Sequence, residues 1–360
     1  MDMRATLDGA VIMAPMTRGG NLPYRRLCSE LGATITMGEM ALSRKLLRGH
    51  RPEFALLKRA PDERCFAVQL AGNNAEEMAE AARLAVSRGA DFVDVNCGCP
   101  IEDMTRRGLG AALLQKPKRI AAIVDAMVKA IAPVPVTVKI RLGWNEDDRN
   151  YLVVAKAAVD SGASAITVHG RTRAARYRRA ADWEAVGEVV QAVSVPVIGN
   201  GDILFPHEIA AFKARSGCTA VMIARGALIK PWIFREATDG YIDFDAPARM
   251  QLLERYVTLG REHFGTDERG ERRLRGFLVW HCGFWCRYVP RHADGTYPVM
   301  QEREEHFEPR NELEVLLSRD DAAAHEWLCD LLLKGADAAG PAPALPTAEA
   351  ANSRSDMAEG

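Results

Sequence analysis

Residues 195–226 read VPVIGNGDILFPHEIAAFKARSGCTAVMIARG, and they contain two strand-like segments with one helix-like segment between them. The segments Val195–Ile198 and Thr219–Ile223 are short and rich in β-branched residues, which is typical of buried strands. Pro206–Arg215 has the apolar spacing of an amphipathic helix. A strand, a crossover helix and a second strand form the unit from which parallel sheets are built.

This alternation of strand and helix extends back to the N-terminus. Six further strand-like runs precede the quoted stretch: Val11–Met13, Thr34–Met37, Cys65–Leu70, Phe92–Val95, Val136–Ile140 and Ala165–Val168. Helical patterns lie between them: Ala75–Ser87, Lys118–Ala130, Tyr151–Asp160 and Trp183–Ala192. Eight strands, each apolar enough to be covered on both faces, predict an α/β fold of the TIM (β/α)8 barrel type. A doubly wound open sheet is the alternative, but it would need a glycine-rich loop after the first strand, where this chain has Ala14, Pro15 and Met16.

The character of the sequence changes after the eighth strand. Met250–Glu262, Arg273–Tyr288 and Leu313–Leu333 have helical periodicity, and no convincing strand lies among them. The end of the chain is rich in Ala, Pro and Ser, a composition that is typical of disorder. We therefore expect a barrel domain over residues 1–244, a smaller all-helical domain over 245–338 and a disordered tail over 339–360.

Composition sets limits on the class of protein. The 360 residues are 48% hydrophobic and 26% charged, with a net charge of −1, so an RNA-binding surface would have to come from local clustering of charge. The N-terminal residues lack the pattern of a signal peptide, and no apolar run reaches the roughly 20 residues that span a bilayer. Cys97 and Cys99 are too close in sequence for ordinary zinc ligation, and the eight cysteines suit reduced thiols. We expect a cytoplasmic protein with no membrane partner and no metal.

A polar or sulfur-containing side chain lies at or just beyond the end of each strand. These side chains are Met16, Glu39, Gln69, Asn96, Lys139, His169, Asn200 and Arg225. One polar residue at a strand end is commonly a solvated loop residue, and Lys139 or His169 alone would fit a surface lysine or a structural histidine. In a parallel barrel, however, all carboxyl ends of strands meet at one mouth. Convergent amide, imidazole and cationic groups there predict a site for a polar heterocycle.

The last two strand ends predict phosphate binding. Gly199, Asn200 and Gly201 follow the seventh strand, and Arg225 and Gly226 follow the eighth. Barrels often bind phosphate through the loops in these two positions. Glycine lets the backbone approach an anion closely, so the pattern indicates a phosphorylated cofactor.

Cys99 lies in the sequence DVNCGCP, residues 94–100, in a loop that follows the fourth strand. A thiol with an unperturbed pKa of about 8.5 is protonated at neutral pH and can act as an acid. A nucleophilic thiolate would instead need an activating cation nearby. The spacing of the motif does not choose between these two roles.

Together these residues resemble the tRNA-dihydrouridine synthase family. The resemblance rests on motifs in a fixed order: MAPMT at 13–17, FAVQLAGN at 66–73, DVNCGCP at 94–100, GLGAALL at 108–114, VKIRLGW at 138–144, VHGRTR at 168–173, GNGDI at 199–203 and ARGAL at 224–228. It is dense over the barrel and thinner over the helical region. The NCGCP motif and the GEMALSRKLLRGH stretch are most similar to the branch that acts on the tRNA variable loop.

The resemblance implies FMN in the barrel mouth and NADPH as its reductant. It implies cofactor contacts from Ala14, Pro15, Met16, Gln69, Asn96, Lys139, His169, Asn200, Gly201, Asp202, Ala224, Arg225 and Gly226. The flavin would pass hydride to carbon 6 of a uracil that has left its stack, while Cys99 protonates carbon 5. The implied function is reduction of uridine to dihydrouridine in tRNA.

Two clusters of basic residues could contact tRNA. The loop after the sixth strand contains five arginines and a tyrosine within nine residues, and we expect RNA contacts from Arg141, Arg171, Arg173, Arg176, Tyr177 and Arg178. A second cluster runs from Arg269 to Arg275 and includes Arg287 and Arg291. The alternative for either cluster is a solvated basic surface.

Other functions remain open from the residues alone. A flavin barrel could reduce a small pyrimidine or an enone, and a lyase could use Lys139 as a Schiff base. A purely structural RNA-binding role would leave the polar strand ends without a purpose. We expect a monomer.

Overall fold

The computed structural model describes residues 1–300 and 308–344. The chain divides into two compact units. One comprises Met1–Asp243 with the described residues 290–300, and the other comprises Phe244–Val289 with the described residues 308–344. Residues 290–300 thus group with the first unit, although the sequence-based division at residue 244 assigns them to the second. Most of the predicted tail, residues 345–360, lies outside the described residues.

The first unit is a closed parallel barrel, as predicted. Its strands are β1 Val11–Met13, β2 Ile35–Met37, β3 Ala41–Leu42, β4 Phe66–Ala71, β5 Phe92–Cys97, β6 Val136–Arg141, β7 Ala165–His169, β8 Val197–Asn200 and β9 Ala220–Ile223. Strand β1 pairs with both β2 and β9, and β2 pairs with β4, which closes a ring of eight. The two-residue strand β3 continues β2 along the end of β4. All pairings are parallel, so the strands' carboxyl ends meet at one mouth.

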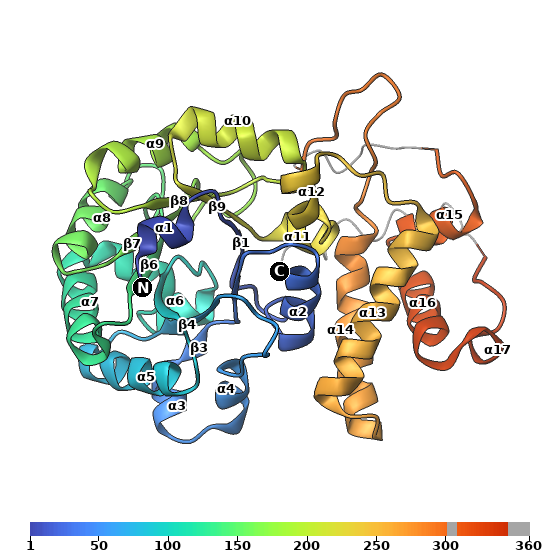
Figure 1. Ribbon diagram of the computed structural model, residues 1–360, viewed down its shortest axis with the longest axis horizontal. Coiled ribbons are helices and arrows are strands. Elements are labelled where there is room, and N and C mark those ends of the chain that lie inside the picture. Colours follow the sequence, from blue (N-terminus) through green and yellow to red (C-terminus); the bar gives the residue numbers. More distant parts are fainter. Residues whose placement is uncertain (301–307, 345–360) are drawn as a thin grey trace. The chain divides into compact units, whose positions relative to one another are not determined.

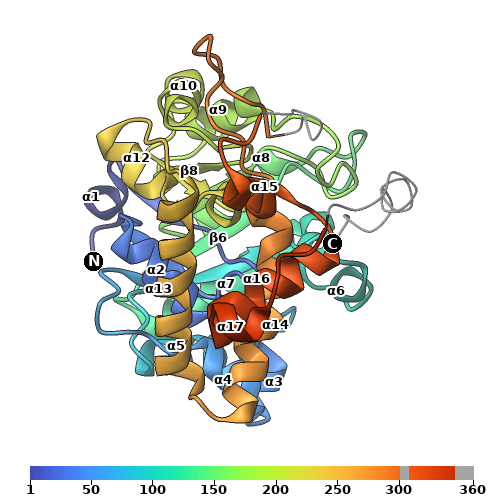
Figure 2. The same cartoon turned by 90° about the vertical axis from the view of Figure 1, so that its right-hand side faces the viewer.

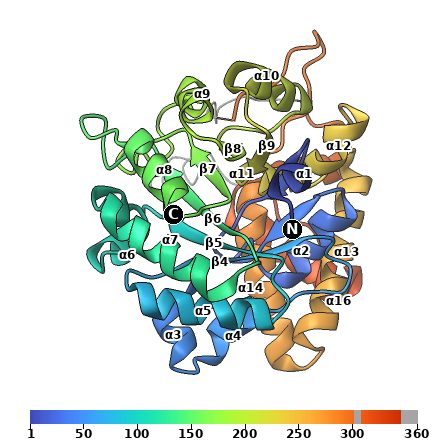
Figure 3. The same cartoon turned by 60° about the vertical axis from the view of Figure 1, so that its left-hand side comes forward.

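Helices surround the ring of strands. The barrel unit contains α1 Met3–Leu7, α2 Leu22–Glu30, α3 Ser43–Leu47, α4 Arg51–Leu56, α5 Ala75–Ser87, α6 Glu102–Arg106, the 3₁₀ helix η1 Gly110–Gln115, α7 Pro117–Ile131, α8 Tyr151–Asp160, α9 Trp183–Ala192, α10 Pro206–Ser216, α11 Arg225–Ile229 and α12 Ile233–Asp239. Figures 1 and 3 show α5, α7, α8 and α9 on the outside of the strands. Helices α5, α8 and α9 begin and end at the predicted residues. Side-chain caps explain two of the starts, because Asn74 and Asp182 each accept a backbone N–H bond at 2.9 Å.

The barrel interior is packed with side chains. Inward positions alternate along each strand, and the buried cluster includes Ile12, Ile35, Ala67, Phe92, Ala165, Ile198 and Met222. Met16 and Ala224 pack against this cluster from the ends of β1 and β9. Because the interior is filled, the chemistry of the barrel is confined to the mouth.

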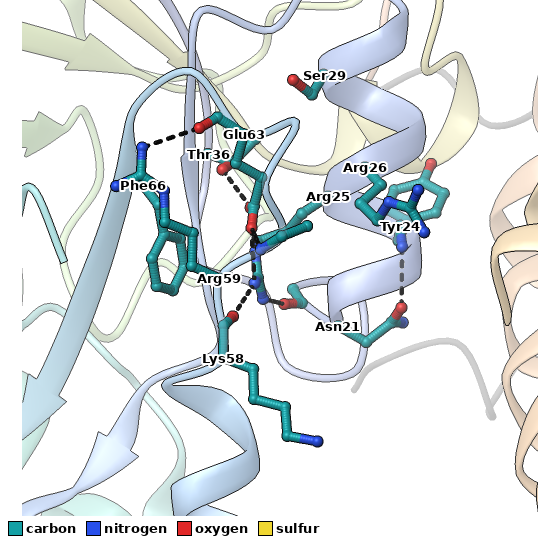
Figure 4. A network of polar contacts seen from close by, with 12 residues as sticks. Asn21, Tyr24, Arg25, Arg26, Ser29, Thr36, Lys58, Arg59, Glu63 and Phe66 are labelled. Atoms are coloured by element: carbon teal, nitrogen blue, oxygen red, sulfur yellow. Dashed lines mark hydrogen bonds and ion pairs between the residues drawn. The ribbon is translucent and has the colours of Figure 1, made fainter. Parts of the chain in front are cut away.

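A buried ion pair fastens α2 to the segment that precedes β4 (Figure 4). Arg25 Nε donates to Glu63 Oε1 at 2.7 Å, and its other nitrogens donate to the carbonyls of Gly20 and Lys58. Glu63 also accepts from the Thr36 hydroxyl at 2.6 Å, and both members of the pair are almost completely buried. The Arg25 guanidinium lies 4.6 Å from the centre of the Phe66 ring. The other oxygen of Glu63, Oε2, accepts the Ala60 backbone N–H at 2.7 Å, so both oxygens of this carboxylate accept hydrogen bonds inside the fold.

The second unit is helical within the described residues (Figure 2). It contains α13 Ala246–Phe264, α14 Glu268–Trp285, α15 Glu312–Ser318, α16 Ala322–Lys334 and α17 Ala336–Ala339. The sequence predicted one helix over Leu313–Leu333, but the structure has two, because Asp321 caps α16 by accepting the backbone N–H of Ala324 at 3.0 Å. Buried Arg249 lies 4.7 Å from the centre of the Tyr288 ring and donates to the Trp285 carbonyl. Among the helices of the described residues, none combines the length and apolarity that a membrane crossing requires.

Candidate active site

A chain of buried amide and carboxylate groups underlies the mouth on the side of β4 and β5. Asn96 Nδ2 donates to Gln69 Oε1 at 2.6 Å, and Gln69 Nε2 donates to Asp94 Oδ2 at 2.8 Å. The Thr137 hydroxyl on β6 donates to the other carboxylate oxygen of Asp94 at 2.6 Å. Gln69 and Asn96, both predicted site residues, are thus fixed by each other and by Asp94.

Asp94 is a residue that the sequence-based selection missed. It lies two positions before Asn96, and side chains two apart on a strand point to the same face. This alternation was the signal that could have found Asp94, and also Thr137 before Lys139. Burial raises the pKa of Asp94 to about 6, although the bonds from Thr137 and Gln69 and the charge of Lys139 lower it.

Lys139 extends from β6 toward β8. Its Nζ donates to Asn200 Oδ1 at 3.0 Å, and Asn200 Nδ2 donates to the Met222 carbonyl at 2.8 Å. Burial, together with the charge of Arg141, lowers the pKa of Lys139 to about 8, against the opposing charge of Asp94. Lys139 and Asn200, predicted from different strand ends, therefore form one contact across the mouth.

His169 ends β7 and is buried. Within the described residues, its Nδ1 is buried and has no hydrogen-bond partner. Burial lowers the pKa of His169 well below its ordinary value, and the charges of Arg141 and Lys139 lower it further. The ring is therefore neutral at physiological pH, and it offers a buried polar atom to a ligand.

Cys99 is the half-buried thiol of the loop after β5. Asn96 Oδ1 accepts the backbone N–H of Cys99 at 2.9 Å, which fixes the loop over the strand end. Gly110, with φ 59°, packs closely against the backbone of this loop, because a Cβ on Gly110 would be only 2.7 Å from the Cys99 carbonyl oxygen. Burial raises the pKa of the Cys99 thiol despite the nearby charges of Arg141 and Lys139. A protonated thiol suits an acid, whereas a nucleophile would need the opposite shift.

Asp202 connects the two turns predicted to bind phosphate, which follow β8 and β9. Its carboxylate accepts from Arg171 Nη2 at 2.6 and 2.7 Å, from the Ala181 backbone at 2.7 Å and from Arg225 Nη2 at 3.2 Å. Asp202 itself has φ 54°, in the left-handed region that aspartate tolerates. A Cβ on Gly226 would lie 2.0 Å from the Ile203 carbonyl, so only glycine fits where the two turns meet.

The remaining predicted cofactor residues surround the ends of β1 and β9. Ala14 is buried and its backbone N–H donates to the Ile223 carbonyl at 2.9 Å. Pro15 and Met16 follow it and are half-buried, as is Ala224 before α11. Glu39 is half-buried in the same part of the mouth, where burial raises its pKa and a backbone bond from Arg18 opposes this.

The arginine-rich loop leaves and re-enters the barrel at a narrow neck. The Asp182 backbone N–H donates to the Gly170 carbonyl at 2.7 Å, and a Cβ on Gly170 would be only 2.8 Å from Asp182. At the tip, Arg176, Tyr177 and Arg178 are exposed, as an RNA-binding loop requires. This arrangement is compatible with the contacts predicted for the three tip residues.

Arg171 differs from the prediction for this loop. Its side chain is 1% exposed and lies in the neck, where Nε donates to the Arg179 carbonyl. A side chain enclosed in this way is not available to an RNA strand, so we do not retain Arg171 as an RNA contact. Arg173 is half-buried, and its guanidinium stacks 4.5 Å from the Trp144 ring centre.

Tyr177 connects the loop tip to the mouth. The Arg225 guanidinium lies 4.1 Å from the centre of the Tyr177 ring, and that of Arg141 lies 5.9 Å from it. Arg141 is itself buried, and it donates to the Gly98 carbonyl at 2.8 Å and to the Thr172 carbonyl at 3.0 Å. Arg141 therefore joins the Cys99 loop to the arginine-rich loop.

Two arginines of the second basic cluster pair with acidic neighbours. Arg272 pairs with Glu268 at 2.6 Å, and Arg275 pairs with Asp330 at 2.6 Å and with Glu326. Arg291 belongs to the barrel unit instead of the helical one.

Within the described residues, no group of three or more His, Cys, Asp or Glu side chains is placed to bind a metal ion.

The fold and the mouth define a class of protein. This is a parallel (β/α)8 barrel whose mouth combines an amide chain, a neutral imidazole, buried cations and two close-packed glycine turns. The unpartnered His169 Nδ1 and the glycine turns fit a phosphorylated ring compound.

Comparison with known proteins gives the family. A model described as Dihydrouridine synthase (Dus) matches residues 12–283. The chain therefore belongs to the dihydrouridine synthase family, and the resemblance inferred from the sequence motifs is confirmed.

Curated relatives extend the similarity into the helical unit. The chain is 38% identical over 356 residues to a tRNA-dihydrouridine(47) synthase, NAD(P)(+), of Coprinopsis cinerea, with 94% of this chain and 52% of the relative covered. It is 39% identical over 345 residues to the similarly named human protein, designated "-like", with the same coverage of both chains. The chain thus spans about half the length of the curated relatives that it matches.

A solved structure supports the fold alone. A 2-naphthoyl-CoA reductase in complex with 2-naphthoyl-CoA matches with a TM-score of 0.51 at 13% identity, over 64% of this chain and 50% of that chain. At this identity, the likeness concerns the barrel and not its chemistry.

Proposed function

We propose that the chain is an FMN-dependent tRNA-dihydrouridine synthase, which uses NADPH to reduce the C5–C6 double bond of a uridine in tRNA. The observation that carries the proposal is Cys99, a half-buried thiol with a raised pKa at the mouth of a barrel of this family. The names of the curated relatives support tRNA as substrate and NAD(P) as the nicotinamide cofactor.

The mouth supports a flavin mononucleotide as the resident group. Met16, Gln69, Asn96, Lys139 and His169 would hold its ring and ribityl chain, and the turns at Asn200–Asp202 and Ala224–Gly226 would hold its phosphate. When bound, the flavin supplies hydride transfer to the pyrimidine. The protein then has to place the base and supply a proton.

The proton comes from Cys99 in this proposal. Addition of hydride at carbon 6 of the uracil builds negative charge on the base, and the Cys99 thiol removes that charge by protonating carbon 5. Asn96 fixes the loop backbone that carries the thiol, and the cations Lys139 and Arg141 stabilise the developing charge. Burial keeps the thiol protonated until it is needed.

The function is tested with tRNA that lacks dihydrouridine. The purified protein should contain a flavin, and with NADPH it should convert a defined uridine, which mapping of the modified positions would locate. Purified protein that neither contains nor takes up flavin would contradict the proposal. Turnover of free uracil without retention of tRNA would favour reduction of a small pyrimidine or enone instead.

Affinity for flavin should depend on the protonation of Lys139. Because its pKa is lowered to about 8, the ammonium is present below that pH and is lost above it. We therefore expect flavin affinity to fall as the pH rises from 7 to 9, measured by quenching of flavin fluorescence. Lys139→Arg should move the decline to higher pH, and Lys139→Met should bind weakly with no such decline. A flat wild-type profile would contradict a cationic role for Lys139.

The exposed arginines of the loop tip should contribute to tRNA affinity. The double variant Arg176→Ala and Arg178→Ala should reduce the slope of log affinity against log salt by about one to two units, since each phosphate contact contributes about 0.7–0.9. Flavin affinity should be unchanged. The matched control is Arg83→Ala with Arg88→Ala, two exposed arginines at α5 on the outside of the barrel. An equal loss of slope in the control would show that the effect is one of net charge.

A Schiff-base lyase is the alternative reaction for this mouth. The depressed pKa of Lys139 would also suit a Schiff-base lyase, but membership of the family favours reduction. The variable-loop branch, a cytoplasmic location, a monomeric state and an RNA-binding helical unit all remain predictions. Mapping of the modified uridine would test the first of these directly.

A further inference from the structure

Arg171 has a buried donor for which the described residues provide no acceptor. Two of its nitrogens are engaged, Nη2 by both oxygens of Asp202 and Nε by the Arg179 carbonyl. Within the described part of the chain, its Nη1 is buried and has no acceptor. Buried cationic donors are costly to leave without an acceptor, so this atom points to one that a ligand supplies.

The unused nitrogen lies beside the turn after β8. A Cβ built on Gly201 would be 3.9 Å from Arg171 Nη1 and 2.5 Å from the Cβ of Ala181. Gly201 has φ 139°, a conformation that side-chain-bearing residues rarely adopt. The backbone of this turn therefore packs directly against Ala181 beside Nη1, where no side chain on residue 201 would fit, and loops in this position of a barrel commonly bind phosphate.

The charges around this turn favour an anion. Arg171 and Arg225 both donate to the single carboxylate of Asp202, which leaves one net positive charge among the three side chains. The side chain of Arg225 is only 16% exposed, so neither cation is well solvated. Burial lowers the pKa of His169, and neighbouring cations that include Arg171 and Arg225 lower it further, as expected for a mouth with excess positive charge.

We infer that Arg171 is a phosphate-binding residue of the cofactor site, in which Asp202 holds Arg171 and Arg225 side by side so that both donate to one phosphate group. The inference rests on the proposed function, in which this phosphate belongs to FMN. It moves Arg171 from the predicted RNA surface to the cofactor, and it makes Asp202 a residue that orients the two arginines. Charge-assisted bonds from two guanidinium groups suit a phosphate better than one bond would.

The test compares two flavins that differ only in the phosphate. Affinities for riboflavin 5′-phosphate and for riboflavin are measured by fluorescence quenching with the full chain after its flavin has been removed. Arg171→Met should weaken binding of riboflavin 5′-phosphate by about 10–100-fold, the range for one charge-assisted bond, and should change riboflavin binding less than twofold. Arg178→Met, which removes an exposed arginine of the same loop, should change neither affinity.

The ratio of the two affinities separates phosphate binding from support of the fold. An unchanged ratio in Arg171→Met overturns the inference, whether both affinities stay the same or both fall together. If this variant does not fold, Arg171→Lys serves in its place, because an ammonium cannot hold Asp202 bidentately and also donate from the position of Nη1. If the wild-type protein binds neither flavin, the proposed function fails and the inference fails with it. If wild type prefers the phosphorylated form and the variants keep that preference, only the role of Arg171 is rejected.

Discussion

Replacement of Cys99 by alanine is expected to lower the rate of dihydrouridine formation by about 10²–10⁴-fold, the usual contribution of a general acid. The variant should still bind flavin, because the residues proposed to hold it come from the strand ends. NADPH should still reduce that flavin, since this half-reaction needs no proton on the uracil. Single-turnover formation of dihydrouridine, with flavin absorbance recorded alongside, measures both steps.

Cys286→Ala is the matched control for the Cys99 variant. Cys286 is also a half-buried thiol with a raised pKa, but it follows α14 in the helical unit. Its replacement should leave the rate of dihydrouridine formation unchanged. Wild-type activity in Cys99→Ala would reject the acid role, and a loss of flavin binding would show that the residue supports the cofactor instead.

Glu63→Ala should give the largest loss of stability among the variants considered. The substitution leaves the Arg25 guanidinium buried without its carboxylate, and breaking a buried ion pair from one side costs about 3–5 kcal/mol. The Thr36 hydroxyl and the Ala60 backbone N–H lose their acceptor as well. We expect the free energy of unfolding of the barrel to fall by that amount in chemical denaturation followed by circular dichroism.

The neighbouring residue provides the control for this prediction. Asp62 pairs with Arg26 at 3.0 Å near the surface, where the two side chains are 41% and 20% exposed. Solvent screens such a pair, so Asp62→Ala should cost only about 0–1 kcal/mol. Equal losses in the two variants would show that the network around Arg25 does not behave as a buried pair.

The architecture of the barrel was largely readable from the sequence. Strands that are buried on both faces appear in the sequence as runs of β-branched residues. Helices α5, α8 and α9 begin and end at the residues that the apolar periodicity predicts. The boundary between α15 and α16 was missed because the apolar pattern continues through it. The second helix begins where the Asp321 side chain caps it. Periodicity does not separate two helices when the second begins with a side-chain cap.

Residues of the candidate site could be predicted from the sequence only where the position of a residue along a strand determines its place in the barrel. A parallel barrel brings all strand ends to one mouth, so Asn96, Lys139, His169 and Asn200 could be gathered from sequence. Asp94 was missed because the selection took one residue from each strand end and ignored the inward position two residues earlier. Arg171 was misjudged because a run of arginines does not record that the first of them meets an aspartate 31 residues later.

The neck of the arginine-rich loop has a consequence for evolution and for engineering. Since the loop departs and returns at adjoining backbone positions, Gly170 and Asp182, its tip can be lengthened, shortened or exchanged without moving β7 or α9. Under the proposed role of the tip in binding tRNA, chains of this architecture can diverge in the RNA that they recognise while the residues at the strand ends stay constant. Under the same proposal, a tip grafted from one relative onto another should change the choice of target.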